Sequence, residues 1–156
     1  MAKQFKSNNV AISQSVKRKN AKHDVLLTLC PCDSGLHYSS CCGVYIEGAA
    51  PAESAVALMR SRYTAYTMAK ITYIQKTMRG NALRGFHPGE AKRWARRVEW
   101  EGLRVLKVVP ENEQLGYVEF IASFREDDVL QSIHEMSKFE RVEGIWYYVD
   151  GFNLSR

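Results

Sequence analysis

Residues 30–43 read CPCDSGLHYSSCCG and contain all four cysteines of the 156-residue chain: Cys30, Cys32, Cys41 and Cys42. Cys30 and Cys32 are too close in sequence for an easy disulfide, and Cys41 with Cys42 would form only a strained vicinal one. Four thiolates in one short loop instead suit a tetrahedral zinc ion, which binds sulfur at about 2.3 Å. Because four cysteines fill the coordination shell, the pattern predicts one structural Zn²⁺ and no open catalytic position.

The loop between the two cysteine pairs has the composition of a turn. Asp33-Ser34-Gly35 favours a chain reversal that aims backbone N–H groups at the sulfurs. His37 is the one spare ligand nearby, and we expect it to be a surface residue of the loop. The alternative to a zinc site is a redox-active or merely reduced group of thiols.

The net charge is concentrated at the N-terminal end. Residues 1–24 hold six basic residues and one acid and so account for the whole formal charge of +5, whereas residues 25–156 hold 16 of each sign. This predicts a basic mobile tail over residues 1–24. The composition, 46% hydrophobic and 25% charged, is that of a globular protein and excludes a fibre or a wholly disordered chain.

The N-terminus and the apolar segments indicate where the protein works. No run of 18 apolar residues predicts a transmembrane helix, so we expect no membrane contact. The first 20 residues are polar and lack the apolar stretch of a secretory signal, so we expect the protein to be cytoplasmic.

Downstream of the cysteines the pattern predicts helices followed by strands. Apolar residues at helical spacing predict three helices separated by turn-rich segments, over residues 51–68, 71–78 and 90–98, with a loop over residues 80–89. Alternating residues then predict four strands joined by hairpins, over residues 100–109, 116–124, 130–141 and 145–150, with an irregularity at Gly102. Helices before an antiparallel meander indicate an α+β fold.

Residues 30–43 resemble the SEC-C motif, the zinc knuckle with the pattern C-x-C-x8-C-[CH] found at the C-terminus of the SecA translocation ATPase. The ligand spacing matches. The usual Gly-Ser-Gly-Lys is replaced by Asp33-Ser34-Gly35-Leu36, and the basic residues near the tip by His37 and Ser39. The chain has no nucleotide-binding motif, so the resemblance does not imply an ATPase.

Residues 30–152 are similar to the YchJ-like family of small bacterial proteins, on the stretches CPCDSG with CCG, AVALMRSRYTAY, YIQKT, EWEGLRV, LGYVEFIASF, HEMSKF and WYYVDG. The resemblance implies a SEC-C knuckle over residues 25–48 and a nuclear transport factor 2-like cone over residues 49–156. In such a cone, helices pack on a curved four-stranded antiparallel sheet. Family members carry a Thr-Trp-His-Pro-like segment where this chain has Thr77-Met78-Arg79-Gly80, and many have a second knuckle at the C-terminus, whereas this chain ends at Arg156 soon after the last predicted strand.

The ionisable residues of the predicted cone allow two interpretations of its interior: a buried ion pair or a ligand-binding pocket. Alternation puts His134 and Glu135 on opposite faces of the third strand, so they make a geometrically poor acid–base pair. Glu135 is expected to meet Arg60 or Arg62 of the long helix, as a buried ion pair. The alternative is a wet pocket, and its candidate ligand-binding residues are Arg62, Tyr63, His134 and Glu135.

For function, the sequence favours a binding or adaptor module without catalytic activity. A knuckle too small for its own core is typically a recognition surface for a protein partner or a clamp on the neighbouring domain, and the basic tail predicts attraction to a polyanion such as ribosomal RNA. A second basic patch is predicted on the third helix, at Lys92, Arg93, Arg96 and Arg97. No motif reads DNA bases, so specific DNA recognition is not expected. The alternative is a cone that binds or converts a small molecule.

Overall fold

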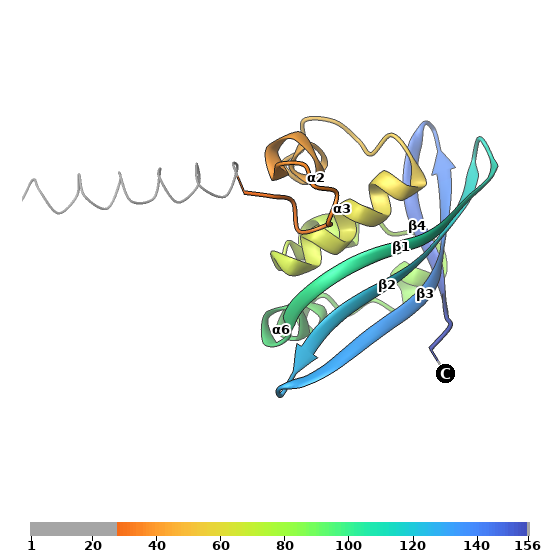
Figure 1. Cartoon of the computed structure of the whole chain (residues 1–156). Helices are drawn as coiled ribbons and strands as arrows, with labels where there is room; N and C mark the ends of the chain where they lie inside the picture. Colours follow the sequence, from red (N-terminus) through yellow and green to blue (C-terminus); the bar gives the residue numbers. More distant parts are fainter. Residues whose placement is uncertain (1–27, 156) are drawn as a thin grey trace, which may run out of the picture.

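The structure, a computed structural model, describes residues 28–155 and confirms the α+β fold (Figure 1). Among the described residues, a 3-10 turn and five helices precede the sheet: η1 (Tyr38–Ser40), α2 (Cys42–Ile46), α3 (Ala55–Thr67), α4 (Ile71–Lys76), α5 (Gly80–Arg84) and α6 (Pro88–Arg97). Four strands follow: β1 (Glu99–Asn112), β2 (Leu115–Glu126), β3 (Val129–Val142) and β4 (Ile145–Asn153). The predicted tail, residues 1–24, lies outside the described residues.

The strands form one antiparallel sheet in the order β1-β2-β3-β4, as the hairpin-length connections predicted. The sheet curves around the helices, and α3 lies across its concave side (Figure 1). The pairing of β1 with β2 shifts register between Trp100 and Gly102, and Gly102 has a φ of 156°. Glycine adopts this backbone region without steric cost, so the predicted irregularity in β1 is confirmed.

Helix α3 begins later than the sequence predicted, at Ala55 and not at Pro51. The Ser54 hydroxyl accepts a hydrogen bond from the backbone N–H of Ala57 at 3.1 Å and so caps the helix. A serine side chain satisfies one of the free N–H groups of a first helical turn, so the cap sets the start of the helix at Ala55. The helix ends at Thr67, and Ala69 leaves it with a φ of 52°.

Helix α3 is buried on both of its long sides, because the knuckle packs on one side and the sheet on the other (Figure 1). Its buried residues therefore include polar ones such as Ser61, Arg62 and Thr64. Ser61 Oγ donates to the Leu58 carbonyl at 2.9 Å and lies 2.7 Å from Tyr73 Oη. Such pairing is what makes burial of polar groups tolerable.

The segment predicted as a loop, residues 80–89, is partly helical: α5 occupies Gly80–Arg84, and α6 begins at Pro88. Glycine and proline at these places signalled a loop, but a tertiary contact supports the extra helical turn. Asn81 Nδ2 donates to Asp150 Oδ2 of β4 at 3.1 Å. Local propensity is a weak prior that such contacts override.

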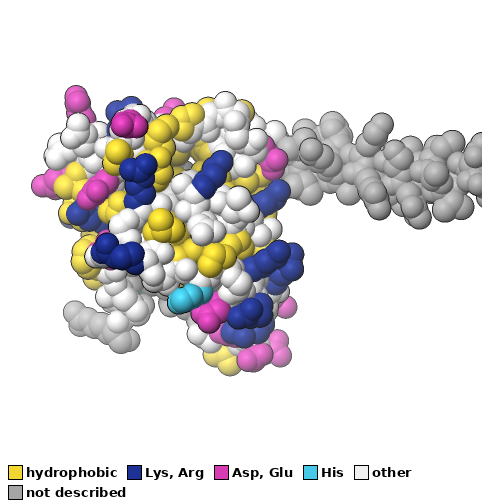
Figure 2. Space-filling view, turned by 180° about the vertical axis from the view of Figure 1, so that it is seen from behind, with side chains coloured by type: hydrophobic (Ala, Val, Ile, Leu, Met, Phe, Trp, Pro, Cys, Tyr) yellow, Lys and Arg dark blue, Asp and Glu magenta, His cyan; other side chains and the backbone are white. Residues whose placement is uncertain are grey.

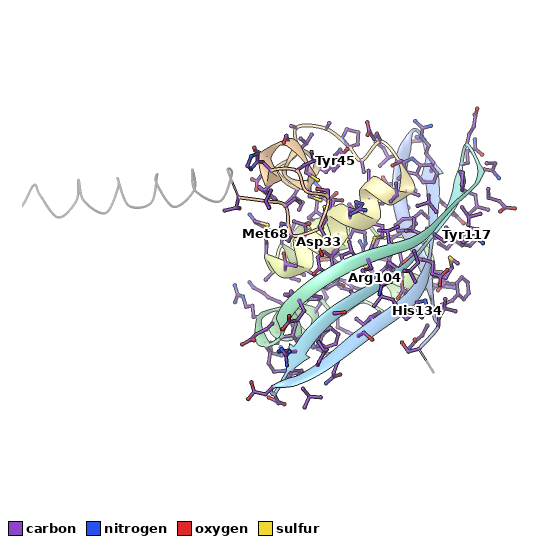
Figure 3. All side chains as sticks on the ribbon, in the orientation of Figure 1. Asp33, Tyr45, Met68, Arg104, Tyr117 and His134 are labelled. Carbon is purple, nitrogen blue, oxygen red and sulfur yellow. The ribbon has the colours of Figure 1, made fainter. Side chains whose placement is uncertain are left out.

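The two faces of the sheet follow the alternation along the strands, and His134 and Glu135 lie on opposite faces as predicted. Val118, Phe120 and Ala122 of β2 face the helices, and β3 continues this inner face with Ile133, Glu135 and Ser137. His134 lies on the outer face, with Arg104 and Tyr117 (Figure 3). Within residues 28–155, no helix is long and apolar enough to cross a bilayer.

Candidate functional site

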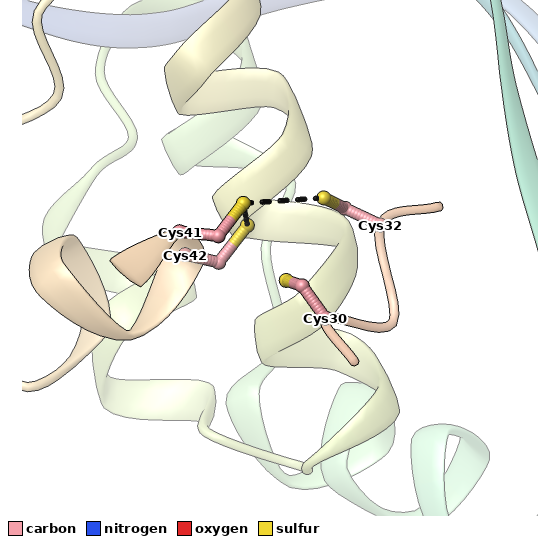
Figure 4. A group of neighbouring side chains, drawn as sticks. All are labelled: Cys30, Cys32, Cys41 and Cys42. Carbon is pink, nitrogen blue, oxygen red and sulfur yellow. Dashed lines mark hydrogen bonds between the residues drawn. The ribbon is translucent and has the colours of Figure 1, made fainter. Parts of the chain in front are cut away.

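The four cysteines converge on one point although they come from two separate turns (Figure 4). Their sulfur atoms all lie within 4.8 Å of one another; Cys32 Sγ is 3.6 Å from Cys41 Sγ, and Cys41 Sγ is 3.9 Å from Cys42 Sγ. A tetrahedron of sulfurs at about 2.3 Å from a central zinc has edges of about 3.8 Å. The four thiols are unpaired and lie close enough together to bind one metal ion.

The thiolate is the form that binds metals. The surroundings of the sulfurs favour it at Cys32, whereas burial raises the pKa of Cys41 and a hydrogen bond with Cys30 raises the pKa of Cys42. Cys30, Cys32 and Cys42 are buried, and Cys41 is half-buried beside Ser34 Oγ at 3.2 Å. Hydrogen bonds, the largest from Cys30 and the next from Cys42, hold the pKa of Cys32 well below its usual range. His37 is exposed, as expected of a surface residue of the loop.

The knuckle is bonded directly to the helix and sheet of the cone. Arg60 Nη1 of α3 donates to the Cys32 carbonyl at 2.6 Å. Asp33, which is labelled in Figure 3, accepts at Oδ2 from the backbone N–H of Leu103 in β1 at 2.9 Å. Cys30 Sγ lies 3.6 Å from Thr64 Oγ1. Cys30, Cys32 and Cys42 belong to the same hydrophobic core as α3 and the sheet, so the knuckle braces the cone.

A second candidate site is a cavity of about 180 Å³ between α3, α6 and the inner face of the sheet. Aromatic and aliphatic side chains form most of its wall, and polar ones gather in it from α3, β3 and β4. The lining residues are Met59, Arg62, Tyr63, Tyr66, Trp94, Trp100, Phe120, Ala122, Ile133, Glu135, Ser137, Phe139 and Tyr148.

The aromatic wall is held by edge-to-face contacts. The ring centres of Trp94 and Trp100 are 5.2 Å apart with planes at 85°, and Trp100 meets Tyr63 at 5.6 Å and 86°. Trp94 also packs edge-on against Phe124 at 5.3 Å. These distances lie in the favourable range for aromatic pairs, so the wall is a packed surface that keeps its shape.

Arg62 is only 6% exposed, and none of the described carboxylates lies within 4.0 Å of its guanidinium. Nη1 donates to the Ile74 carbonyl and to Thr77 Oγ1, both at 2.7 Å, and Cζ lies 4.6 Å from the centre of the Tyr148 ring. Burial lowers the pKa of Arg62, and neighbouring tyrosines and Glu135 oppose that shift.

The expected ion pair of Glu135 with Arg60 or Arg62 is therefore not formed. Arg60 bonds the Cys32 carbonyl, and Glu135 Oε1 accepts from Ser137 Oγ at 2.6 Å and from Tyr148 Oη at 2.9 Å. The physical reason is that other groups nearby bind each charge: backbone carbonyls and a hydroxyl accept from the two arginines, and two hydroxyls donate to Glu135. Arg62 and Glu135 thus line one cavity as separate charges.

Tyr148 is held in place by the segment in which this chain departs from the YchJ-like pattern. Its N–H donates to the Thr77 carbonyl at 2.9 Å, and the Arg79 N–H donates back to the Tyr148 carbonyl at 3.0 Å. Met78 is buried and forms a parallel bridge with Tyr148. Neither Met78 nor Arg79 lines the cavity, whereas Tyr148 does. These two residues, which differ from the family pattern, therefore contact the cavity through Tyr148.

Of the four predicted pocket residues, Arg62, Tyr63 and Glu135 line the cavity and His134 does not. On the outer face of the sheet, His134 Nε2 lies 2.8 Å from Glu119 Oε1. Tyr148, the partner of Glu135, is one of the aromatic residues whose positions in the sequence suit a pocket wall, but it is not among the four predicted ligand-binding residues. The glycine at position 151 is the sequence feature that fits this contact, because a Cβ there would lie 2.3 Å from Tyr148 Oη and 2.5 Å from Glu135 Oε1.

A larger hollow of about 420 Å³ lies between the segment that follows α2 and the start of β4. Small residues such as Gly48, Ala49 and Ala50 form much of its wall, and Lys76 is the only charged residue among those that line it. It offers few groups that would orient a ligand. The cavity around Arg62 is therefore the stronger candidate.

Comparison with known proteins agrees with this architecture. Residues 54–151 match the family model described as YchJ, middle NTF2-like domain, where NTF2 is nuclear transport factor 2. A UPF0225 protein of Geobacter sulfurreducens is 38% identical over 132 residues, which cover 83% of this chain and 81% of that protein. A UPF0225 protein of Haemophilus influenzae (strain PittEE) is 40% identical over 121 residues, 78% of this chain and 76% of the other.

Two solved structures share the fold. The solution structure of a SEC-C motif containing protein from Rhodopseudomonas palustris has a TM-score of 0.74 and 37% identity, covering 81% of this chain and 98% of that one. The crystal structure of a SEC-C motif containing protein from Psychrobacter arcticus has a TM-score of 0.72 and 30% identity, covering 81% of this chain and 82% of that one. With its knuckle, its helices and its four-stranded sheet, this chain belongs to the YchJ-like (UPF0225) family.

Proposed function

We propose that the protein is a zinc-braced binding protein whose cone takes up a small ligand without converting it. The observation that carries the proposal is the cavity, in which an aromatic wall surrounds a buried guanidinium that has no described carboxylate within 4.0 Å. Burying an unpaired charge costs free energy. A ligand that supplies the missing partner recovers this free energy, so the cavity is built for an occupant.

The size of the cavity limits the ligand. Sites for drug-sized ligands measure about 300–1,000 Å³, and this cavity measures about 180 Å³. A small metabolite with an apolar body fits this space better than a nucleotide or a lipid. Of the chain's three tryptophans, Trp94 and Trp100 line it, so tryptophan fluorescence reports on its occupant.

The arrangement of titratable groups favours binding over catalysis. General acid–base catalysis needs an acid and a base within hydrogen-bond reach of one substrate. His134 lies on the outer face, and Glu135 is the only carboxylate among the residues that line the cavity. One oxygen of Glu135 is already engaged by Ser137 and Tyr148.

Zinc is the metal that suits the four cysteines. Thiolates are soft ligands, and a closed set of four sulfurs with tetrahedral spacing is typical of structural zinc sites. The ion supplies a cross-link and leaves no position for a substrate. Because Arg60 and Thr64 of α3 contact the knuckle, and α3 also supplies Arg62, the cross-link supports one wall of the cavity.

Nuclear magnetic resonance with labelled methyl groups tests the binding function. We expect small aromatic and zwitterionic compounds to shift the methyl signals of Met59 and Ala122, both of which line the cavity. Ile133→Trp places a large ring in the cavity and should abolish the shifts. The control, Ser132→Trp, adds the same ring to an exposed neighbouring position of β3. If no compound shifts these signals in the wild-type protein, the binding function is refuted.

A second candidate function, binding of a polyanion such as RNA, is supported by α6. Lys92, Arg93 and Arg96 are exposed and have no acidic partner within 4.0 Å in the described chain, whereas Arg97 pairs with Glu126. Lys and Arg side chains gather at the lower right of Figure 2, where the rotation puts α6. The basic residues of segment 1–24 would add to this charge.

Co-sedimentation with ribosomes and total RNA tests the second function. We expect pelleting to fade between about 50 and 200 mM salt, because phosphate contacts release counterions. Replacing Arg93 and Arg96 with Gln should weaken pelleting, and replacing Arg97, which is already paired, should weaken it less. Absence of pelleting at low salt would refute this function and leave the cavity unaffected.

A further inference from the structure

The polar residues of the cavity use only part of their hydrogen-bonding capacity within the protein. The hydrogen bonds of Arg62 all come from Nη1, and those of Glu135 all go to Oε1. The other guanidinium nitrogens and the second carboxylate oxygen thus have no hydrogen-bond partner among the described residues. The same holds for the Tyr66 hydroxyl, although Tyr66 lines the cavity as well.

These three groups are close enough to influence one another. Burial raises the pKa of Tyr66, the charge of Arg62 lowers it, and the charge of Glu135 raises it again. Arg62 and Glu135 are nevertheless more than 4.0 Å apart, since they form no ion pair. A positive group, a phenol hydroxyl and a negative group thus lie in one cavity, with a gap between the two charges.

We infer that the ligand is a small zwitterion of the amino-acid type, with its carboxylate at Arg62 and Tyr66, its ammonium at Glu135, and its side chain against the aromatic wall. The inference rests on the proposed function, because it names the class of ligand that the cone takes up. Carboxylates pair well with guanidinium donors, and ammonium groups donate to carboxylates.

The alternatives each leave a charge without a partner. An anion would satisfy Arg62 but be repelled by Glu135, and a cation would do the reverse. A neutral molecule would displace water from both groups and neutralise neither. Specificity arises when the wrong ligand leaves a buried polar group unpaired. Only a ligand with both charges satisfies both groups.

The aromatic residues that line the cavity favour a ligand with an apolar, flat side chain. Trp94, Trp100 and Phe120 line the cavity from α6, β1 and β2. Flat apolar groups pack well against such rings, in edge-to-face or offset geometry. An aromatic amino acid combines such a body with the two charges, and L-phenylalanine is therefore the probe of choice.

A panel of four related compounds separates the contributions. L-Phenylalanine carries both charges, 3-phenylpropanoate only the carboxylate, 2-phenylethylamine only the ammonium, and benzyl alcohol neither. Binding is followed by tryptophan fluorescence of the zinc-loaded full chain, excited where the probes do not absorb. We expect L-phenylalanine to bind at least tenfold more tightly than each of the others, a difference of about 1.4 kcal/mol.

The variant Glu135→Gln tests the ammonium site with little risk to folding, because glutamine keeps the shape and the carbonyl acceptor for Ser137 and Tyr148. We expect it to weaken L-phenylalanine tenfold or more and to leave 3-phenylpropanoate unchanged or tighter. The matched control is Glu119→Gln, the same substitution on the outer face, which should change neither. A structural defect would instead weaken both ligands alike.

Two results would overturn the inference, and they differ in what else they refute. If benzyl alcohol or either singly charged compound binds as tightly as L-phenylalanine, the cavity binds small ligands but does not select a zwitterion. If none of the four compounds binds, and none of the screened compounds shifts the Met59 and Ala122 methyl signals, the proposed function fails as well.

Discussion

Gly151 of β4 offers the sharpest test of the polar cluster in the cavity. A Cβ added there would lie 2.3 Å from Tyr148 Oη, 2.5 Å from Glu135 Oε1 and 2.6 Å from Glu135 Cδ. Such distances are far inside van der Waals contact, so Gly151→Ala must displace the ends of the Tyr148 and Glu135 side chains. The hydrogen bond between them, 2.9 Å long, would be lost.

The cost follows from the two groups displaced. A hydrogen bond to a charged group contributes about 1.5–3 kcal/mol, and forced overpacking costs about 1–3 kcal/mol. Since Glu135 is partly exposed, we expect the free energy of unfolding to fall by about 2–5 kcal/mol. Gly151 has no positive φ, so alanine fits its backbone and would otherwise stabilise the protein by about 0.4–1 kcal/mol through the unfolded chain. The crowding therefore reverses the sign.

Urea denaturation followed by circular dichroism measures the change. The control is Gly85→Ala, since a Cβ at Gly85 meets only Asn81 O at the ordinary distance of 3.9 Å, and φ there is −92°. Gly85→Ala should be neutral or slightly stabilising. Adding Tyr148→Phe to Gly151→Ala removes the nearest oxygen and should recover part of the loss. If Gly151→Ala is as stable as Gly85→Ala, the described packing around Glu135 is wrong.

Three further predictions concern the knuckle and one buried tyrosine, Tyr63. Elemental analysis should find one zinc per chain, and chelation should lower the melting temperature in a single transition, because the knuckle and α3 share one core; two separate transitions would contradict the brace. Arg60→Met keeps the apolar stem but removes the donor to the Cys32 carbonyl, and should lower the free energy of unfolding by about 1–3 kcal/mol, whereas an unchanged urea midpoint would count against that bond. Burial raises the pKa of Tyr63 to about 12, above its value of about 10 in the unfolded chain. The folded state thus favours the neutral phenol, and its contribution to stability is present below about pH 10 and lost as the pH rises towards 12. Tyr63→Phe should reduce this alkaline loss in pH-dependent denaturation, and an equal loss in the variant would refute the assignment.

The elements that could be predicted from sequence are those that depend on near neighbours. The strands were recognised because alternation along Val118, Phe120 and Ala122 reports the face of a sheet directly. The start of α3 differs from the predicted one because Pro51 is typical of a first helical turn, whereas the side chain of Ser54 makes the cap. The short helix α5 could not be predicted, because its glycine-rich surroundings favour a loop and the contact between Asn81 and Asp150, 69 residues apart in the sequence, is visible only in the structure.

By itself, the sequence determined the cysteine pattern and the order of helices and strands, since spacing and periodicity act over a few residues. Only the tertiary structure decided the cavity, because its charged residues come from α3 and β3 and meet only when the sheet curves over the helix. It also decided that Arg62 and Glu135 stay apart. Carbonyl and hydroxyl groups of α4 hold the guanidinium, and hydroxyls of β3 and β4 hold the carboxylate. No local pattern encodes which of several nearby acceptors a buried charge will reach.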